Sequence, residues 1–350
     1  MGCGRCDSLP KIEFSKVNAY VSLPTQHHVE VVEKVLIDNR YEFEAMDKGF
    51  MIQGADFPSL VSFMTDSLFN DVEEHDVRIL PLEADEVLSF TSLKDFRSLY
   101  DWKILYQWNE VSSIIREERI KTLFQPIVDI KRDTIYGYEA LSRGIMKNGE
   151  LMNPAELFSK AKEMDLLFYL DRVCRESSIR AASTAGIKEK IFINFIPTAI
   201  YQPELCLQST EKVLKEEGLD SKQIVFEVVE SERIVDFSHL NRILNYYRNK
   251  GFSTALDDLG SGYSNIDALM ELKPDYMKID LEIIRDIHKD PGKQEVLDAY
   301  IKNGKSLGLI ILAEGVESAE EYHYLKEKEV DLIQGYYFGK PQEVPLKIES

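Results

Sequence analysis

Two adjacent aspartates, Asp257 and Asp258, stand directly after the apolar residues Thr254-Ala255-Leu256 and before Gly260 and Gly262. Neighbouring carboxylates at the end of a buried strand repel each other and resist transfer out of water. Cations would relieve that cost. A carboxylate pair suits two neighbouring divalent ions, which in phosphoryl displacement lie roughly 3.5–4 Å apart and clamp the attacking and leaving oxygens. The pair therefore predicts a metal site.

The same placement of a polar residue after an apolar run recurs along the chain. The other residues placed in this way are Glu139, Asn194, Glu227, Lys278, Asp280, Glu314 and Gln334. Together with the paired aspartates they supply six carboxylates, two amides and one amine. Oxygen donors without Cys or His favour Mg²⁺ or Mn²⁺ over zinc. A single glutamate at a strand end is as often an ion-pair or capping residue, so the prediction depends on the joint pattern.

Two cationic residues accompany these acids. Lys278 either forms a structural ion pair with Asp257 or Asp280, or it orients an attacking water and stabilises charge on a phosphate. Arg143 either holds a non-bridging phosphate oxygen through a bidentate contact or lies on the surface. The Gly-Ser-Gly sequence at 260–262 is a weak signal for a phosphate loop, because no Gly-Lys-Ser/Thr sequence follows it.

Eight short apolar runs after Ile120 are predicted to position these residues. They are TLFQPIVDI, TIYGYEALSR, KIFINFIP, QIVFEVVESE, FSTALDDLG, YMKID, LIILAEGVES and LIQGYYFG. Amphipathic stretches, for example 154–182 and 237–250, separate several of them. Strands that alternate with helices predict a mainly parallel α/β sheet, and eight such strands favour a closed β/α barrel. Since the carboxyl ends of barrel strands meet at one mouth, the polar residues are expected to converge there.

A small α+β domain is predicted for residues 1–84. Its strands VNAYVSL, YEFEAM, GFMIQG and DVRILPL and two helical stretches follow the order βαββαβ, which is typical of ferredoxin-like units. No catalytic set groups there, so we expect a regulatory or interaction domain whose signal or partner is not identified. Residues 85–118 are predicted to form a helical connector, and residues 119–350 the barrel.

Composition limits the function classes. The 42 Lys and Arg residues against 61 Asp and Glu residues give a formal charge of −19, which argues against broad binding to nucleic acid polymers or anionic membranes. A small phosphorylated ligand remains compatible if bound cations intervene. No signal peptide is apparent and the longest apolar run is too short to cross a bilayer, so a cytoplasmic protein is expected. Cys3 and Cys6 form one C-x-x-C pair, half of a zinc site or a redox pair, in an N-terminus expected to be flexible.

The segment YEALSR at 138–143 carries the E-A-L-x-R signature, and the chain resembles the EAL-domain cyclic di-GMP phosphodiesterases. The similarity continues through FQPIVD, INFIP, FEVVESE, LDDLGSGYSN, YMKID, AEGVES and QGYYFGKP, in the order and spacing of the family. The resemblance implies a modified TIM (β/α)8 barrel that hydrolyses cyclic di-GMP to linear pGpG with Mg²⁺ or Mn²⁺, by in-line attack of metal-activated water. It also implies two ions and a homodimer formed through the barrel.

The resemblance further implies roles for individual residues. The implied metal ligands are Glu139, Asn194, Glu227 and Asp257, with Asp258 serving the second ion. The implied catalytic group consists of Glu314 as general base or water-orienting carboxylate, Lys278 as a contact of the nucleophilic water, Asp280, and Glu230, which steadies the loop after the paired aspartates. The implied substrate contacts are Gln125, Leu141, Arg143 and Gln334, the last of them near the metal site.

Three residues depart from the family pattern, namely Val229, Leu259 and Asn265, where Thr, Phe and Ser are commoner. They touch the loop and its support, so the turnover rate and dimer coupling stay open, but the ligand set is intact. A module that binds cyclic di-GMP without turnover is the alternative function. A barrel enzyme of other metal chemistry, such as enolate stabilisation, is disfavoured because no second Lys or His base is apparent at the mouth.

Overall fold

The computed structural model describes residues 9, 11–228, 237–259 and 266–347, except for the side chains of 258, 259 and 266–268. The chain forms two compact units. The N-terminal unit comprises Asp7–Arg116 with Ser159–Leu166, and the barrel unit includes Glu117–Phe158 and the chain from Leu167 onward. The predicted domain boundaries at 84 and 118 stay predictions. None of the described helices combines the length and apolarity that a bilayer crossing requires.

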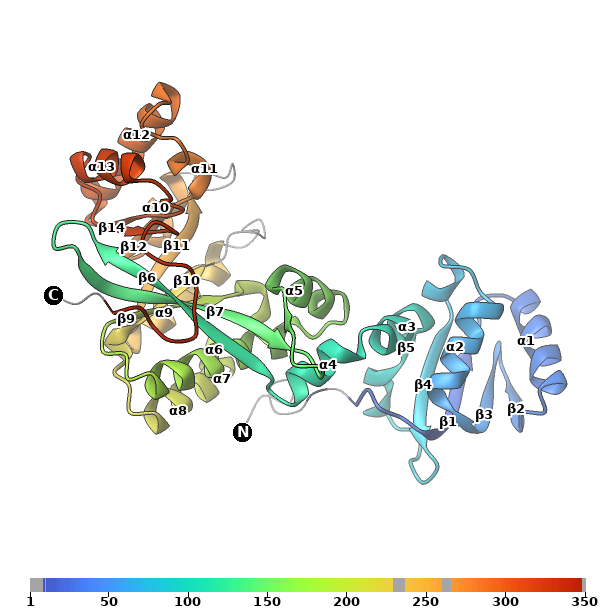
Figure 1. The fold of residues 1–350 in the computed structure, drawn as a ribbon. Coiled ribbons are helices and arrows are strands. Elements are labelled where there is room, and N and C mark those ends of the chain that lie inside the picture. Colours follow the sequence, from blue (N-terminus) through green and yellow to red (C-terminus); the bar gives the residue numbers. More distant parts are fainter. Residues whose placement is uncertain (1–8, 10, 229–236, 260–265, 348–350) are drawn as a thin grey trace. The chain divides into compact units, whose positions relative to one another are not determined.

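The N-terminal unit is an antiparallel sheet with helices, in the predicted order βαββαβ (Figure 1). Its elements are β1 (Lys16–Ser22), α1 (Gln26–Asp38), β2 (Phe43–Met46), β3 (Gly49–Asp56), α2 (Phe57–Ser67), β4 (Arg78–Glu83), β5 (Arg97–Ser98), α3 (Leu99–Gln107) and α4 (Asn109–Arg116). The strand order is β2-β3-β1-β4-β5. The short strand β5 lies inside the stretch that was expected to be wholly helical, because it pairs with β4, which is distant in sequence.

An aromatic cluster forms part of the core of this unit. The Trp102 ring packs edge-to-face against Phe14 and Phe57 at centroid distances of 5.7 and 5.0 Å. The indole Nε1–H donates to the Ile79 carbonyl oxygen at 3.0 Å, so the one polar atom of this buried ring is satisfied. The cluster ties α2 and α3 to strand β4.

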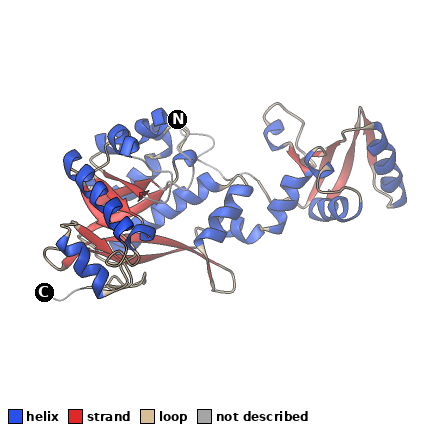
Figure 2. Cartoon of the chain, turned by 90° about the horizontal axis from the view of Figure 1, so that it is seen from above, coloured by secondary structure: helices blue, strands red, loops and turns tan. Residues whose placement is uncertain are grey.

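Eight described strands of the second unit close into a barrel, as predicted (Figures 1 and 2). They are β6 (Ile120–Asp129), β7 (Thr134–Ile145), β9 (Lys190–Phe195), β10 (Ile224–Val228), β11 (Ser253–Leu259), β12 (Tyr276–Ile279), β13 (Ile310–Ala313) and β14 (Leu332–Gln334). The order is β6-β14-β13-β12-β11-β10-β9-β7, and β6 also pairs with β7; β8 (Leu151–Met152) extends the sheet beyond β7. Strand β6 runs antiparallel to both neighbours, because the short segment 130–133 joins it to β7 as a hairpin.

Helices separate most of the barrel strands in the sequence, and the part of α5 from Ser159 onward belongs to the N-terminal unit. These helices are α5 (Pro154–Glu163), α6 (Leu167–Thr184), α7 (Pro203–Cys206), α8 (Gln208–Glu216), α9 (Phe237–Asn249), α10 (Ile266–Leu272), α11 (Leu281–Ile284), α12 (Pro291–Leu307) and α13 (Ala319–Glu327). Short 3₁₀ turns lie at Glu73–His75, Ser92–Asp95, Pro197–Ala199 and Ser221–Gln223. The amphipathic stretch 154–182 forms two helices, since Asp165 between them has a positive φ of 54° that an α-helix does not accept.

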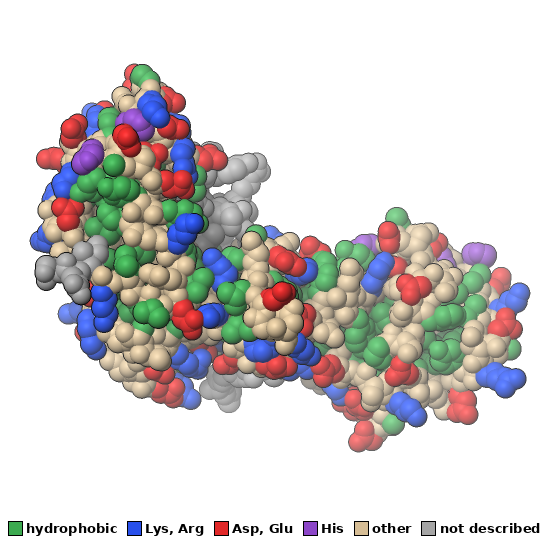
Figure 3. Space-filling view, viewed as in Figure 1, with side chains coloured by type: hydrophobic (Ala, Val, Ile, Leu, Met, Phe, Trp, Pro, Cys, Tyr) green, Lys and Arg blue, Asp and Glu red, His purple; other side chains and the backbone are tan. Residues whose placement is uncertain are grey.

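Apolar side chains fill the barrel in one layer. This layer consists of Ile127, Phe192, Val225, Ala255, Tyr276, Leu312 and Leu332, all buried. Alternate residues of the same strands, such as Ile191, Ile193 and Phe195, belong to the larger core that also includes helix residues. Since side chains alternate across a strand, the next inward-facing residue of each strand lies two positions from this layer. In the face drawn in Figure 3, acidic and basic side chains of the described residues are interspersed over the surface.

Candidate active site

The candidate site is the layer of polar side chains next to the apolar layer. Asn194, Glu227, Asp257, Lys278, Glu314 and Gln334 each follow a residue of the apolar layer by two positions. Gln125 instead precedes Ile127 by two positions, because β6 runs in the opposite direction, and it pairs across the sheet with Glu139. Strand pleating and strand direction therefore bring the predicted polar residues to one end of the barrel.

The ammonium group of Lys278 lies among carboxylates from four different strands or strand ends. Its Nζ atom is 2.7 Å from Glu314 Oε1, 3.0 Å from Glu227 Oε1 and 3.0 Å from Asp257 Oδ2. Glu139 Oε1 is 4.0 Å away. The lysine side chain is 1% exposed, so these contacts form out of contact with solvent. The structure therefore brings together Lys278, Glu139, Glu227, Asp257 and Glu314, as the strand-end pattern predicted.

Two amides hold Glu139 in place. Asn194 Nδ2 donates to Glu139 Oε1 at 2.9 Å, and Gln334 Nε2 donates to Glu139 Oε2 at 2.7 Å. Gln334 Nε2 also donates to Gln125 Oε1 at 3.1 Å. Each amide thus directs its NH₂ group to an oxygen acceptor. The Gln334 Oε1 atom is buried and accepts no hydrogen bond from the described residues.

Glu227 is the most enclosed acid of the site. Its side chain is fully buried, and neither carboxyl oxygen accepts a hydrogen bond from the described residues, although Oε1 lies within ion-pair distance of Lys278. Buried acceptors of this kind are rare unless water or an ion is bound. Among the described side chains no three acidic, His or Cys residues are already arranged around one point as metal ligands. The oxygen donor set and the unsatisfied oxygens nevertheless fit a hard divalent cation.

Burial and charge move the pKa values of this cluster in different directions. Burial raises the pKa values of Glu227 and Glu314 well above that of an ordinary glutamate, against the opposing effect of Lys278. Burial acts in the same sense on Glu139, but Lys278 and hydrogen bonds from Gln334 and Asn194 outweigh it and lower that pKa. Burial alone would lower the pKa of Lys278, but the surrounding carboxylates raise it well above the usual value. Lys278 therefore keeps its positive charge, and Glu227 and Glu314 hold protons more readily than Glu139 does.

Other predicted residues lie elsewhere. The Asp280 Oδ1 atom accepts the Glu282 N–H at 2.6 Å and caps α11, and Asp280 makes no ion pair with Lys278 among the described contacts. The half-buried Arg143 donates to the Ser142 carbonyl oxygen at 2.9 Å, and burial lowers its pKa. Leu141 is partly exposed on β7. The predicted residues Glu230, Val229 and Asn265, and the side chains of Asp258 and Leu259, lie outside the described part of the chain.

A buried ion pair on α6 supports the site and was missed in the sequence. Asp171 Oδ1 accepts the N–H of Ile196, two residues after Asn194, at 2.9 Å. Asp171 Oδ2 also accepts from Arg175 Nε at 2.9 Å, and Arg175 is fully buried. The i,i+4 spacing of Asp171 and Arg175 in an amphipathic helix was the available signal. It could not distinguish a buried pair from an exposed one.

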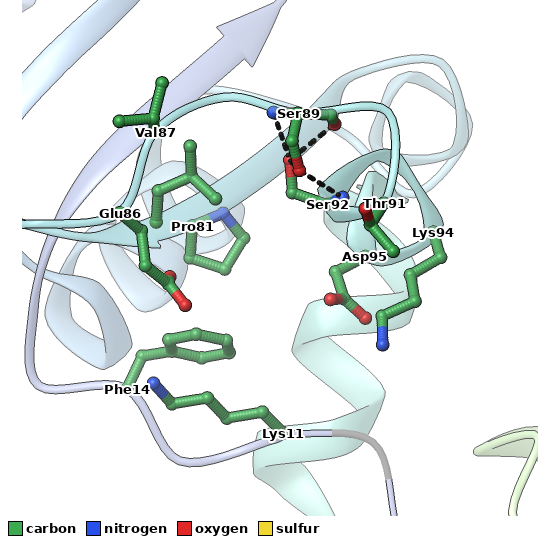
Figure 4. A pocket seen from close by; sticks show the side chains of 11 residues that line it. Lys11, Phe14, Pro81, Glu86, Val87, Ser89, Thr91, Ser92, Lys94 and Asp95 are labelled. Atoms are coloured by element: carbon green, nitrogen blue, oxygen red, sulfur yellow. Dashed lines mark hydrogen bonds between the residues drawn. The ribbon is translucent and has the colours of Figure 1, made fainter. Parts of the chain in front are cut away.

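The N-terminal unit contains a pocket of about 260 Å³ (Figure 4). Phe14, Pro81 and Leu82 give it apolar walls, and the segment with Ser89 and Ser92 forms another side. The backbone N–H of each serine donates to the hydroxyl of the other, and Lys11 pairs with Glu83. Its polar groups are therefore largely engaged within the protein, and they indicate no ligand class.

Similarity to known proteins covers mainly the barrel. The probable cyclic di-GMP phosphodiesterase PdeG of Escherichia coli (strain K12) is 32% identical over 235 residues, which are 65% of this chain and 45% of PdeG. The chain thus matches less than half of that relative's length. A standalone versatile EAL protein from Vibrio cholerae O395, solved in its c-di-GMP bound form, is 40% identical with a TM-score of 0.58 over 64% of this chain and 92% of that one.

One solved structure extends the likeness to the N-terminal unit. Klebsiella pneumoniae BlrP1, in a manganese and cy-diGMP complex, covers 93% of this chain and 96% of its own with a TM-score of 0.58. At 21% identity this likeness shows the fold alone. The EAL domain family model matches residues 108–341, which are more than half of the sequence. The chain belongs to the EAL domain family.

Proposed function

We propose that this chain hydrolyses cyclic di-GMP to linear pGpG with the help of Mg²⁺ or Mn²⁺, with two ions bound. The observation that carries the proposal is the convergence of four carboxylates, two amides and Lys278 at one end of an EAL-type barrel. The relative PdeG carries the name of this activity, and the Vibrio cholerae relative was solved with c-di-GMP. Both relatives support the substrate.

Metal ions would be held by the oxygen atoms of this site. The proposed ligands are Glu139, Asn194, Glu227 and Asp257, with Asp258 for the second ion. When bound, such ions supply Lewis acidity, which makes a water more acidic and neutralises charge on a phosphoryl group. They also let an anionic diester approach a protein whose formal charge is −19.

The remaining residues bind, orient and exchange protons. Glu314, whose Oε1 is 2.7 Å from Lys278 Nζ, is the proposed proton acceptor, and Lys278 the proposed group that orients the attacking water. Arg143 would hold a non-bridging phosphate oxygen, since its Nη1 atom contacts a backbone carbonyl that it can exchange for a charged partner. Gln125, Leu141 and Gln334 would contact the dinucleotide.

Separation of products by chromatography tests the proposal. Purified protein is stripped of metal with EDTA, dialysed, and incubated with cyclic di-GMP alone, with MgCl₂ or with MnCl₂. We expect pGpG to form only when a divalent ion is added. Tight binding of cyclic di-GMP without product would instead identify a binding module. The absence of both binding and product formation would refute both functions.

Regulation, location in the cell and oligomeric state also belong to the proposed function. We propose that the N-terminal unit regulates the barrel through a signal or partner that the sequence does not reveal, that the protein acts in the cytoplasm, and that barrels pair in a homodimer. Size-exclusion chromatography with light scattering measures the last of these directly. A monomer at micromolar concentration would contradict the dimer.

A further inference from the structure

We infer that Lys278 and a divalent cation are alternative neutralisers of the same carboxylates, so that Lys278 stabilises the metal-free barrel and moves away from Glu227 and Asp257 when a metal ion binds. The inference rests on the proposed function only in taking this layer of residues to be the metal site. It assigns to Lys278 a control over metal loading, in addition to any role in turnover.

Lys278 Nζ contacts carboxylate oxygens that a metal ion would also use. Glu227 Oε1, Asp257 Oδ2 and Glu314 Oε1 all lie within 3.0 Å of this one nitrogen atom. Glu227 and Asp257 are also proposed metal ligands, and Mg²⁺ binds oxygen at about 2.0–2.1 Å. An ammonium group and a divalent ion that shared these oxygens would repel each other strongly in a site with little solvent. Binding of one therefore opposes the present position of the other.

Lys278 and Glu227 are both buried, so the charge of each depends on the other. The Lys278 side chain is 1% exposed and that of Glu227 is 0% exposed, so water does not solvate the Glu227 carboxylate if the ammonium group is removed. Uncompensated buried charge is strongly destabilising. In the metal-free protein Lys278 is the described cation that offsets these acids, so its loss should destabilise the fold unless a metal ion replaces it.

The hydrogen bonds distinguish Glu227 from Glu139. Glu139 receives two amide N–H groups, from Asn194 and Gln334, which stabilise its negative charge without a cation. The oxygens of Glu227 accept no hydrogen bond from the described residues, and Lys278 is the positive group beside them. Glu227 is therefore the ligand whose charge depends most on the lysine and the one for which a metal competes.

Thermal unfolding and calorimetry of Lys278→Met test the inference. Methionine keeps the unbranched stem and removes the charge. In EDTA we expect a lower Tm than for wild type, a larger rise in Tm on addition of MnCl₂, and Mn²⁺ binding that is roughly tenfold tighter, within the range typical of coupled equilibria. Lys278→Arg keeps the cation and should retain wild-type stability in EDTA more nearly than Lys278→Met does. Lys212→Met, at an exposed lysine of α8, is the matched control and should change none of these values.

Each outcome decides the question. Equal Tm values in EDTA for Lys278→Met and wild type, or weaker Mn²⁺ binding by the variant, would overturn the inference even if wild type forms pGpG. Failure of wild type to bind Mn²⁺ would remove the proposed metal site and the inference together, whereas missing turnover with intact Mn²⁺ binding would count against the proposed function alone. If Lys278→Met folds only with MnCl₂, the inference is supported. If it folds in neither condition, Glu227→Gln/Lys278→Met should restore folding by removing one acid, and failure of this double variant to fold would overturn the inference, because restoring the charge balance would not restore the fold.

Discussion

Glu139 is an acid whose negative charge is stabilised by two neutral hydrogen-bond donors. Its carboxylate is buried and its pKa is lowered, because Lys278 and the amides of Gln334 and Asn194 outweigh the effect of burial. We predict that Glu139→Gln reduces pGpG formation by at least about 100-fold, since loss of even the outer partners of a metal ligand costs roughly 10–100-fold. Rates are measured by chromatography with saturating MnCl₂. Glu150→Gln, at an exposed glutamate of the same unit, is the control. Unchanged turnover of Glu139→Gln would refute its assignment as a ligand.

The start of helix α13 is held in place by the buried carboxylate of Glu321. Glu321 accepts the backbone N–H groups of Asp286 at 2.9 Å, Glu317 at 2.9 Å and Ser318 at 3.1 Å. It thereby joins the start of α13 to the segment that follows Glu314. Burial alone would raise the pKa of Glu321, but these donors outweigh it and lower the pKa below 4.5.

We predict that Glu321→Gln destabilises the fold by about 1–3 kcal/mol at neutral pH, because an ionised acceptor of several N–H groups is lost. A lowered pKa in the folded state gives stability that is present above the unfolded value of 4.5 and is lost as the pH falls through the folded pKa. The difference between variant and wild type should therefore shrink below pH 4.5. Urea unfolding across this range measures it, with Glu320→Gln at the exposed neighbouring position as control. A difference that stays constant with pH would contradict the assignment.

Asp171 and Arg175 form a buried ion pair on helix α6. We predict that Asp171→Asn lowers the free energy of unfolding by about 3–5 kcal/mol, since it leaves a buried guanidinium without its charged partner. Asparagine keeps an oxygen that can accept the Ile196 N–H, so the change removes the charge and the hydrogen bond from Arg175 but leaves the backbone contact in place. Glu216→Gln breaks the exposed pair with Lys212 on α8, where the acid–base distance is 3.7 Å, and should cost less than about 1 kcal/mol. Equal losses in the two variants, measured by urea unfolding, would show that burial of the pair is unimportant.

The N-terminal unit consists of two stretches that are far apart in the sequence. The N-terminal unit includes Ser159–Leu166 from helix α5 and the residues after it, although this segment lies far along the sequence from the rest of that unit. Ala161, Met164 and Leu166 in this segment are buried. The fragment 119–350, which is the predicted barrel domain, therefore carries part of the core of another unit.

We predict that the fragment 119–350 binds more hydrophobic dye and unfolds at a lower temperature than the intact chain, because this segment loses its packing. Exposed apolar surface of this kind favours association. Dye fluorescence and thermal scans at equal concentration measure the effect. The same fragment with Ala161→Gln and Met164→Gln should bind less dye than the unmodified fragment. A fragment as stable and as dye-free as the intact chain would show that the barrel is autonomous.

Local backbone geometry made much of the barrel and its site predictable. All eight predicted barrel strands are present, and Asn194, Glu227, Asp257 and Lys278 face inward because side chains alternate along a strand. The α/β order of segments predicted a barrel, and the strand ends predicted most of the polar residues that meet there, whereas the prediction for Asp280 was wrong because it caps α11. These features depend on neighbours in sequence, so the sequence alone contained them.

Tertiary structure decided how those residues pair. The sequence left Lys278 with Asp257 or Asp280 as its partner; Lys278 contacts Asp257 at 3.0 Å, together with Glu227 and Glu314, whereas Asp280 caps α11. It likewise did not reveal that β6 runs antiparallel, that the Asp171–Arg175 pair is buried, or that 159–166 belongs to the N-terminal unit. The burial of the pair and the membership of 159–166 depend on contacts between segments far apart in the chain, whereas the direction of β6 follows from the short hairpin at 130–133. By itself the sequence determined which chemical groups face the mouth of the barrel, and only the closed fold determined which of them neutralise one another.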